Sequence, residues 1–282
     1  MKRYLRWFAG AAVTLCLSCI ANPFGGDDEI SGGSRSVRGQ VKLSNGAKSE
    51  GAFVWLDGFN LGTNVNSQNE FTITLPPPGS QSSGGGASGI YQLYFFLANY
   101  KLNSSSVVTR NGAFVYGQGE VNKNGELLSA KLLERFLRIS TQVSPATVAA
   151  NYTGAITVEV TLEATIDTAT VVFPNTLAGL LGAVLIRRVG GSEVYVAQAV
   201  PGADGSESQR LGRSPVKRGM TFNFINSPLP PGDYEVIPYI LIRHQPVPSL
   251  LMASLGGNVE ELGSSYLNLP MKREGGQFKV TP

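Results

Sequence analysis

The sequence is poor in the side chains that build metal and redox sites. It has two cysteines, Cys16 and Cys19, and a single histidine, His244. A structural zinc site needs about four nitrogen or sulfur ligands at set spacings, so the sequence predicts no metal site and no cofactor. Because both cysteines lie near the N-terminus, no disulfide can link distant parts of the chain. Any folded part must be stabilised by its hydrophobic core.

The sequence also lacks the motifs that place a catalytic group. His244 follows the apolar run 239–242, as expected of a histidine at the end of a strand. No Gly-x-Ser-x-Gly turn is present to hold a serine nucleophile. Gly84-Gly85-Gly86 has no following lysine to bind phosphate, and the acidic groups at 27–28 and 204–207 lack the alternating oxygen ligands of a calcium loop. We therefore expect no catalytic residues and no enzymatic activity.

The N-terminus has the order of charges and apolar residues found in secretion signals. Basic residues at positions 2, 3 and 6 precede an apolar stretch, residues 7–18, which is too short to span a bilayer as a stable helix. The stretch ends in Ser18-Cys19, a small residue before a cysteine. This junction resembles the lipobox of bacterial lipoproteins, in which the cysteine receives diacylglycerol before cleavage. The resemblance implies a signal peptide over residues 1–18 and lipid attachment at Cys19.

Two other interpretations of this segment are less favourable. Acylation of Cys16 would place the bulky Leu15 at the cleavage site, and an ordinary secretion signal would leave Cys19 as a chance residue. Ile20 follows the acceptor and is not the Asp that retains some bacterial lipoproteins in the inner membrane. We therefore expect a lipid-anchored protein of the cell envelope, in the outer membrane rather than the inner membrane.

The charge balance gives no reason to expect a nucleic-acid partner. The formal net charge of the whole sequence is +3. Cleavage of the signal would remove three basic positions and no acidic one, which leaves a chain with equal numbers of each. The basic cluster at Arg210, Arg213, Lys217 and Arg218 is flanked by Pro215 and Gly219, and is expected to be a solvated loop rather than an anion site.

Beyond a Gly- and Asp-rich stretch, residues 19–36, expected to be a lipidated flexible tether, the pattern is that of an antiparallel β protein. Short runs of β-branched and aromatic residues are separated by turn dipeptides, of which the strongest are Asn45-Gly46, Asn111-Gly112 and Asn124-Gly125. The stretch 126–138 is the best helix candidate and could equally be a long edge strand. The sequence therefore predicts an all-β fold with two antiparallel β-sandwich domains.

The predicted domains are residues 37–142 and residues 143–282. The Gly/Ser-rich stretch 79–89 is expected to be a loop of the first. Candidate strands of the second number as many as an immunoglobulin-like sandwich needs; they are residues 156–165, 183–189, 193–200, 220–225, 234–242 and 277–281. The second domain resembles bacterial immunoglobulin-like sandwiches through residues 143–147 and the turn Pro231-Gly232-Asp233-Tyr234.

The first domain carries a longer pattern of turns and strands. Its members are Gly39-Gln40-Val41, Asn45-Gly46, residues 51–56, Thr63, residues 70–76, Gly79, residues 91–93 and Asn99-Tyr100. This pattern resembles the carboxypeptidase regulatory-like domain, a transthyretin-like β-sandwich, over about residues 37–102. Glu70 departs from it, since the family has a turn glycine there, and the Gly/Ser loop separates Gly79 from Tyr91. The resemblance implies an accessory or spacer module and no peptidase activity.

The strand Ile90–Ala98 is apolar on both faces. Tyr91, Leu93, Phe95 and Leu97 share one face, and Tyr94, Phe96 and Ala98 share the other, because successive side chains of a strand point to opposite sides. A half-exposed sandwich strand should alternate with polar residues. Tyr94 and Phe96 are therefore predicted to be covered either by the second domain or by an external partner.

These features support a hypothesis about the class of function, without identifying a ligand. The first hypothesis is a non-enzymatic envelope lipoprotein that serves as a binding or scaffold component, with an envelope protein or a glycan as partner. The alternative is a carbohydrate- or peptide-binding accessory subunit of a separately encoded exported hydrolase. A hydrolytic enzyme is the third and least favoured hypothesis.

Overall fold

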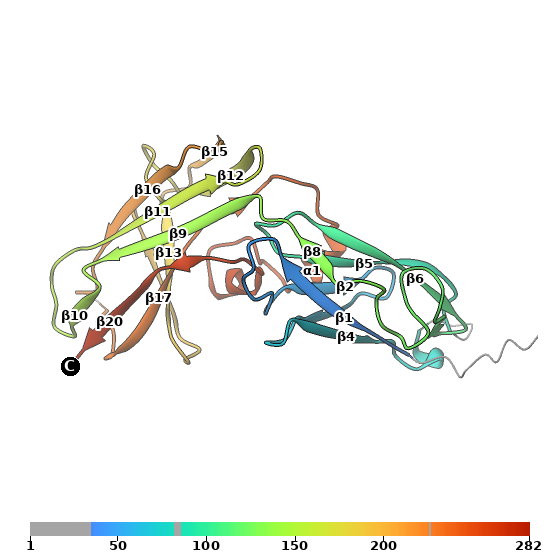
Figure 1. The fold of residues 1–282 in the computed structure, drawn as a ribbon. Coiled ribbons are helices and arrows are strands. Elements are labelled where there is room, and N and C mark those ends of the chain that lie inside the picture. The colour runs from blue at the N-terminus through green and yellow to red at the C-terminus, as the bar shows by residue number, and fades with distance from the viewer. Residues whose placement is uncertain (1–34, 82–85, 226) are drawn as a thin grey trace, which may run out of the picture. The chain divides into compact units, whose positions relative to one another are not determined.

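A computed structural model describes residues 35–81, 86–225 and 227–282, and all of these fall in one compact unit. The predicted signal peptide, Cys19 and nearly all of the predicted tether lie outside the described residues. The described chain is built from strands, with one α-helix and two short 3-10 helices. The prediction of an all-β sandwich fold is confirmed (Figure 1).

The strands before residue 134 form two sheets. One has the order β4-β1-β8 and the other the order β3-β2-β5-β6-β7. All pairs are antiparallel except β1 with β8. Their bounds are β1 Ser36–Leu43, β2 Phe53–Leu56, β3 Leu61–Asn64, β4 Glu70–Thr74, β5 Gly89–Phe96, β6 Asn103–Arg110, β7 Ala113–Phe114 and β8 Lys131–Leu133, with the 3-10 helix η1 at Pro78–Ser80.

These two sheets pack face to face. Val37 and Val41 of β1 and Phe71 of β4 point inward, while Arg38 and Gln40 of β1 are exposed. They meet Val54 of β2 and Phe95 of β5 in one buried cluster. Burial of apolar surface stabilises such a sandwich by about 25 cal/mol per Å².

The strands after residue 136 form a second set of three sheets, ordered β10-β20-β17-β13-β14, β16-β11-β9-β19 and β15-β12-β18. Their bounds are β9 Leu137–Ser144, β10 Thr147–Ala149, β11 Ile156–Ala164, β12 Ala169–Pro174, β13 Ala183–Arg188, β14 Val194–Gln198, β15 Ser206–Leu211, β16 Val216–Phe222, β17 Gly232–Pro238, β18 Leu241–Ile242, β19 Glu274–Gly275 and β20 Gln277–Thr281. The α-helix α1, Ser249–Ser254, and the 3-10 helix η2, Ser264–Asn268, lie between β18 and β19.

The second set encloses its own core, to which every long strand contributes. Val160 of β11, Phe173 of β12, Val184 of β13 and Tyr234 of β17 are all inaccessible to solvent within it. The change from the first set of sheets to the second comes between β8 and β9. Because β9 pairs with β11 across its whole length, this change lies earlier in the chain than the predicted boundary at residue 143.

The turn chemistry behaves as the sequence indicates. Asn111 and Gly112 both have positive φ, at 51° and 80°, and join β6 to β7. Gly46 and Gly125 have φ of 73° and 77°. The stretch 126–138 forms no helix and no single long strand; it contains β8 and the start of β9.

Several strands of the second set were not among the predicted ones, and β12 and β15 are two of them. In β15, Ser206–Leu211, polar and charged residues outnumber apolar ones, so its sequence gives little strand signal. It is held as a strand because it pairs with β12 along six residues.

Candidate binding surface

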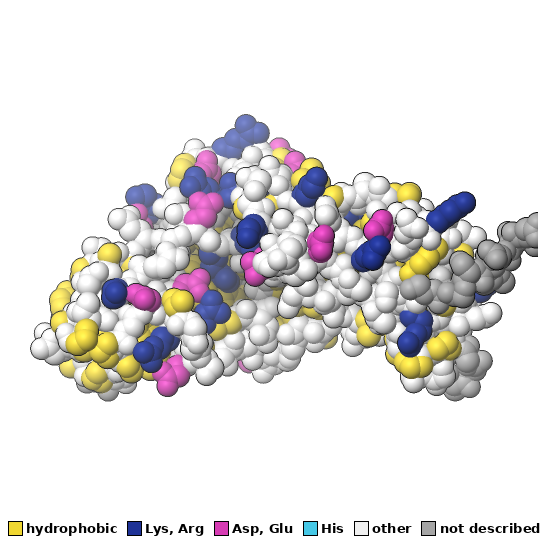
Figure 2. Space-filling model, turned by 60° about the horizontal axis from the view of Figure 1, so that its bottom comes forward, with side chains coloured by type: hydrophobic (Ala, Val, Ile, Leu, Met, Phe, Trp, Pro, Cys, Tyr) yellow, Lys and Arg dark blue, Asp and Glu magenta, His cyan; other side chains and the backbone are white. Residues whose placement is uncertain are grey.

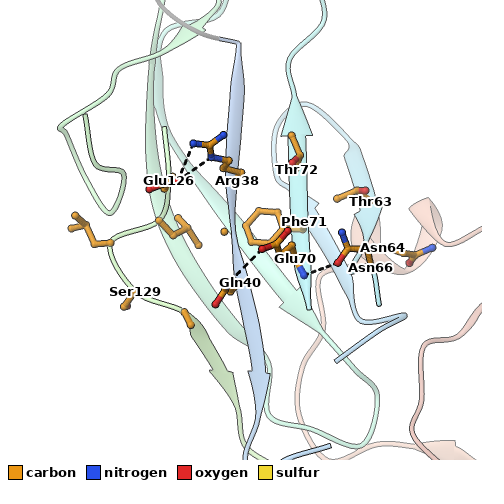
Figure 3. A pocket seen from close by; sticks show the side chains of 14 residues that line it. Arg38, Gln40, Thr63, Asn64, Asn66, Glu70, Phe71, Thr72, Glu126 and Ser129 are labelled. Carbon is orange, nitrogen blue, oxygen red and sulfur yellow. Dashed lines mark hydrogen bonds and ion pairs between the residues drawn. The ribbon is translucent and has the colours of Figure 1, made fainter. Parts of the chain in front are cut away.

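A hollow with a volume of about 750 Å³ lies over the outer face of β1 and β4. We call it the β1–β4 hollow (Figure 3). It is bordered by the end of β3 on one side and by residues 126–130 on the other. Its lining consists of Arg38, Gly39, Gln40, Thr63, Asn64, Asn66, Glu70, Phe71, Thr72, Glu126, Leu127, Leu128, Ser129 and Ala130.

Strand register brings the polar side chains of this hollow together. Arg38 pairs with Thr72 across the sheet, and Gln40 pairs with Glu70. Directly opposed residues of an antiparallel pair project from the same face. The Gln40 amide donates to the Glu70 carboxylate at 3.4 Å.

A neighbouring ion pair fixes one wall of the hollow. Arg38 Nη2 lies 2.9 Å from Glu126 Oε1, and Figure 3 shows the two side chains facing each other. Hydrogen bonds from Asn122 and then from Arg38 hold the pKa of Glu126 below its usual value. Both partners of the ion pair remain largely exposed, so this pair orders side chains more than it stabilises the fold.

Gly39 lies in β1 between Arg38 and Gln40, but a side chain there would point to the core face, where Phe71 is its partner across the sheet. A Cβ atom at Gly39 would lie 3.0 Å from Phe71 Cε1 and 3.1 Å from Leu127 Cγ. Glycine therefore lets these two side chains pack against the β1 backbone. Phe71 itself is 2% exposed, so it offers no ring face to a ligand.

Most of the polar side chains that line the hollow are hydrogen-bond donors or acceptors. The side chains named above supply amides, hydroxyls, two carboxylates and one guanidinium, and they include no histidine, cysteine or lysine. Such a surface can recognise a polar ligand through several hydrogen bonds. It offers no nucleophile paired with a base.

Tyr94 and Phe96, the residues predicted to need a cover, lie on the face of β5 that points away from the first core. Phe96 is 3% exposed, whereas Tyr94 is partly buried and lies with its ring centroid 5.9 Å from that of Trp55. Leu93 and Phe95 of the same strand belong to the first core. The two faces of β5 are thus buried in two different clusters.

The cover of Phe96 comes from later in the chain. One buried cluster joins Phe96 and Trp55 to Leu185 of β13 and Ile237 of β17. The segment between β18 and β19 adds Leu251, Tyr266 and Leu269 to this cluster. The Tyr266 hydroxyl donates to the carbonyl oxygen of Ile240 at 2.7 Å, which satisfies the one polar atom of a side chain that is inaccessible to solvent. No sequence pattern indicated that residues 249–269 would serve this purpose.

His244 lies beside a smaller hollow of about 200 Å³. Its imidazole stacks on Phe136, and burial, with a smaller contribution from Lys101, lowers its pKa below the usual value. Glu260 also lines this hollow, but its carboxylate is held in an ion pair with Arg243. No serine belongs to the lining of this hollow, so the described residues bring no triad together here.

The basic cluster is only in part the solvated loop that the sequence predicts, since Arg213 lies exposed in the loop between β15 and β16. Arg210 lies in β15, and Lys217 and Arg218 lie in β16. Arg218 is 9% exposed and forms a two-pronged ion pair with Glu207. Its guanidinium also lies 4.6 Å from the centre of the Phe173 ring. For Lys217 and Arg218 the prediction was wrong, because the flanking Pro215 and Gly219 indicated a loop, while pairing with β11 holds these two residues in a strand.

Neither a metal site nor a membrane-spanning helix is found in the described residues. Among residues 35–81, 86–225 and 227–282, no three His, Cys, Asp or Glu side chains are grouped so that they could hold a metal ion. No helix in these ranges is long and apolar enough to cross a membrane. Cys19, the predicted lipid attachment site, is outside them.

Comparison with known proteins gives few matches. No family model and no curated protein matches the chain. Among solved structures, the chain is similar to the major pilin subunit BcpA of Bacillus cereus, with 11% identity and a TM-score of 0.25, covering 71% of this chain and 63% of that one. It is also similar to the Bacillus anthracis TIE protein, with 10% identity and a TM-score of 0.23, covering 76% and 30%. The chain spans less than two thirds of either structure's length.

Proposed function

We propose that this protein is a lipid-anchored component of the bacterial cell envelope that binds a polar partner without catalysis. The observation that carries the proposal is the β1–β4 hollow, whose lining supplies hydrogen-bonding groups and no nucleophile with a base. The occupant best suited to amides, hydroxyls and carboxylates is a glycan or a polar segment of an envelope protein. Figure 2 adds that basic and acidic side chains are interspersed over the face it shows, which does not favour a polyanion such as nucleic acid.

The anchoring half of this proposal rests on the N-terminal sequence. Residues 1–18 would be removed as a signal peptide, Cys19 would carry the lipid, and residues 19–36 would form the tether. Ile20 supports the outer membrane as the destination. Acyl chains contribute about 0.8 kcal/mol for each buried methylene, so two or more chains give stable attachment.

The finer family assignments also belong to this proposal. Residues 37–102 would be a carboxypeptidase regulatory-like sandwich within the first set of strands, and the second set, from β9 onward, would be an immunoglobulin-like sandwich. The division of the strands into two sets supports two domains. An accessory module of this kind fits a spacer or ligand-binding part of an exported assembly, including an accessory subunit of a separately encoded hydrolase.

Photo-crosslinking in intact cells tests the binding site. A photoreactive residue at Thr72, which is exposed in the hollow, should yield a discrete adduct, whereas one at Thr221, an exposed threonine on β16, should not. Arg38→Ala with Gln40→Ala should reduce the adduct at Thr72, because these changes remove polar groups from the same surface. Equal adducts from both positions, or no effect of the double change, would contradict the assignment of the hollow.

Mass spectrometry of the mature N-terminal peptide tests the anchor. It should begin at Cys19 and carry the added mass of lipid, and Cys19→Ala should release or misprocess the protein. An unmodified N-terminus at another residue would remove the anchor from the proposal and leave the hollow untouched. Hydrolytic activity of the purified protein that is lost in His244→Ala would instead contradict the non-catalytic function.

A further inference from the structure

The edge strand β14 lacks the charged residues and prolines that usually prevent two sheets from pairing at their edges. Among the described end strands, β4, β14, β15 and β16 have five or more residues. Three of these carry charged residues: Glu70 in β4, Glu207 and Arg210 in β15, and Lys217 and Arg218 in β16. β14, with the sequence Val-Tyr-Val-Ala-Gln, has no charge and no proline. Unprotected edges of this kind present unpaired peptide groups to another strand.

The register shows which peptide groups of β14 are open. Val196 lies opposite Leu185 of β13, and the amide of Ala199 donates to the carbonyl oxygen of Gly182 at 2.9 Å. Hydrogen-bonded and non-bonded pairs alternate along an antiparallel ladder. Tyr195 and Ala197 therefore bond to β13, while the peptide groups of Val194 and Val196 point away from the sheet.

Both faces of β14 lie at the rim of a buried cluster. Tyr195 and Ala197 pack against the core of the second set of sheets. Val194 packs against the cluster that covers Phe96. Val196 is on the same face as Val194 and is 46% exposed. One more strand would extend both apolar faces and cover Val196.

We propose that β14 pairs with β14 of a second copy of this chain, antiparallel and centred on Tyr195. In this register, Val194 of each copy lies opposite Val196 of the other. The two Tyr195 residues lie opposite each other. Cross-strand pairs of β-branched and aromatic residues are stabilising. Glu193 falls opposite Ala197 of the second copy, so like charges do not meet at the ends of the pair.

The two-fold axis also limits the assembly. Each β14 uses its only open edge, so the pairing closes at two copies and does not propagate. The β1–β4 hollow is built from other strands, so pairing at β14 and binding at the hollow can fail independently.

Sedimentation velocity of the purified full-length chain, in detergent where lipid is attached, tests this proposal. The wild-type chain should be a dimer that dissociates on dilution. Val196→Lys should weaken dimerisation about tenfold or more, because a lysine would replace valine against an apolar partner strand. Leu132→Lys is the matched control, since Leu132 is 54% exposed on β8, an end strand of another sheet. It should leave the dimer unchanged.

Hydrogen exchange gives a second measurement that does not depend on a variant. Exchange of the Val194 and Val196 amides should slow as protein concentration rises, because the second copy accepts their hydrogen bonds. Exchange at Thr72 of β4 should not change with concentration. A wild-type chain that stays monomeric, a dimer that Leu132→Lys also dissociates, or β14 exchange that is independent of concentration would overturn the proposal.

Discussion

The imidazole of His244 stacks on the ring of Phe136, with centroids 4.2 Å apart and planes inclined by 31°. The two residues are far apart in sequence, and neither belongs to a catalytic arrangement among the described residues. Burial of His244 disfavours its charged form, so its pKa in the folded protein is below the ordinary value of 6.5.

This shift predicts a pH dependence of stability. Between the folded pKa of His244 and 6.5, the unfolded chain binds more protons than the folded one. The free energy of unfolding should therefore rise with pH through this window and fall on acidification. His244→Phe should flatten this slope while keeping the stacking on Phe136. Urea unfolding at several values between about pH 5 and about pH 8 measures it; a slope unchanged in the variant would assign it to another group.

Phe96 should contribute far more to the free energy of unfolding than Ile90, an exposed residue of the same strand. Phe96→Ala removes a buried ring from the cluster shared with Leu185 and Ile237 and should lower the free energy of unfolding by about 3–5 kcal/mol. Ile90, which is 71% exposed on β5, is the control, and Ile90→Ala should change it by less than about 0.5 kcal/mol. Equal losses in chemical denaturation would contradict the burial of Phe96.

Arg218 and Lys217 are adjacent in β16, but substitution of the buried Arg218 should cost more stability than substitution of the exposed Lys217. Arg218→Ala leaves Glu207 without its partner and removes the contact with Phe173, so we expect a loss of about 1–3 kcal/mol. Lys217 pairs with Glu159 where both side chains are well exposed, and Lys217→Ala should cost about 0–1 kcal/mol. Thermal unfolding of both variants would test the difference, and a larger loss for Lys217→Ala would refute it.

Gly39 should not tolerate even one added methyl group. Its Cβ would lie 3.0–3.2 Å from atoms of Phe71 and Leu127, so Gly39→Ala should destabilise the protein by about 1–3 kcal/mol through overpacking. A Cβ added at Gly212 would meet no atom within 4 Å, and Gly212→Ala should be close to neutral. If Gly39→Ala is also neutral in urea unfolding, the packing of Phe71 and Leu127 against β1 is looser than these contacts indicate.

The sequence by itself determined the local features of this protein. Asn111-Gly112 predicted a tight turn because both residues tolerate positive φ, and the turn is present. Alternation along residues 90–98 correctly separated Leu93 and Phe95 from Phe96, because the strand period fixes which side chains share a face. Both results depend only on neighbouring residues and backbone geometry.

Only the tertiary structure decided what those faces meet. Nothing near Phe96 in sequence identifies Leu185, Ile237 or residues 249–269 as its cover, because packing between distant segments leaves no local pattern. Arg218 resembles a solvated cation until Glu207 and Phe173 are brought beside it. The β1–β4 hollow likewise arises from the register of Arg38 with Thr72 and of Gln40 with Glu70, and register is set by the sheet as a whole.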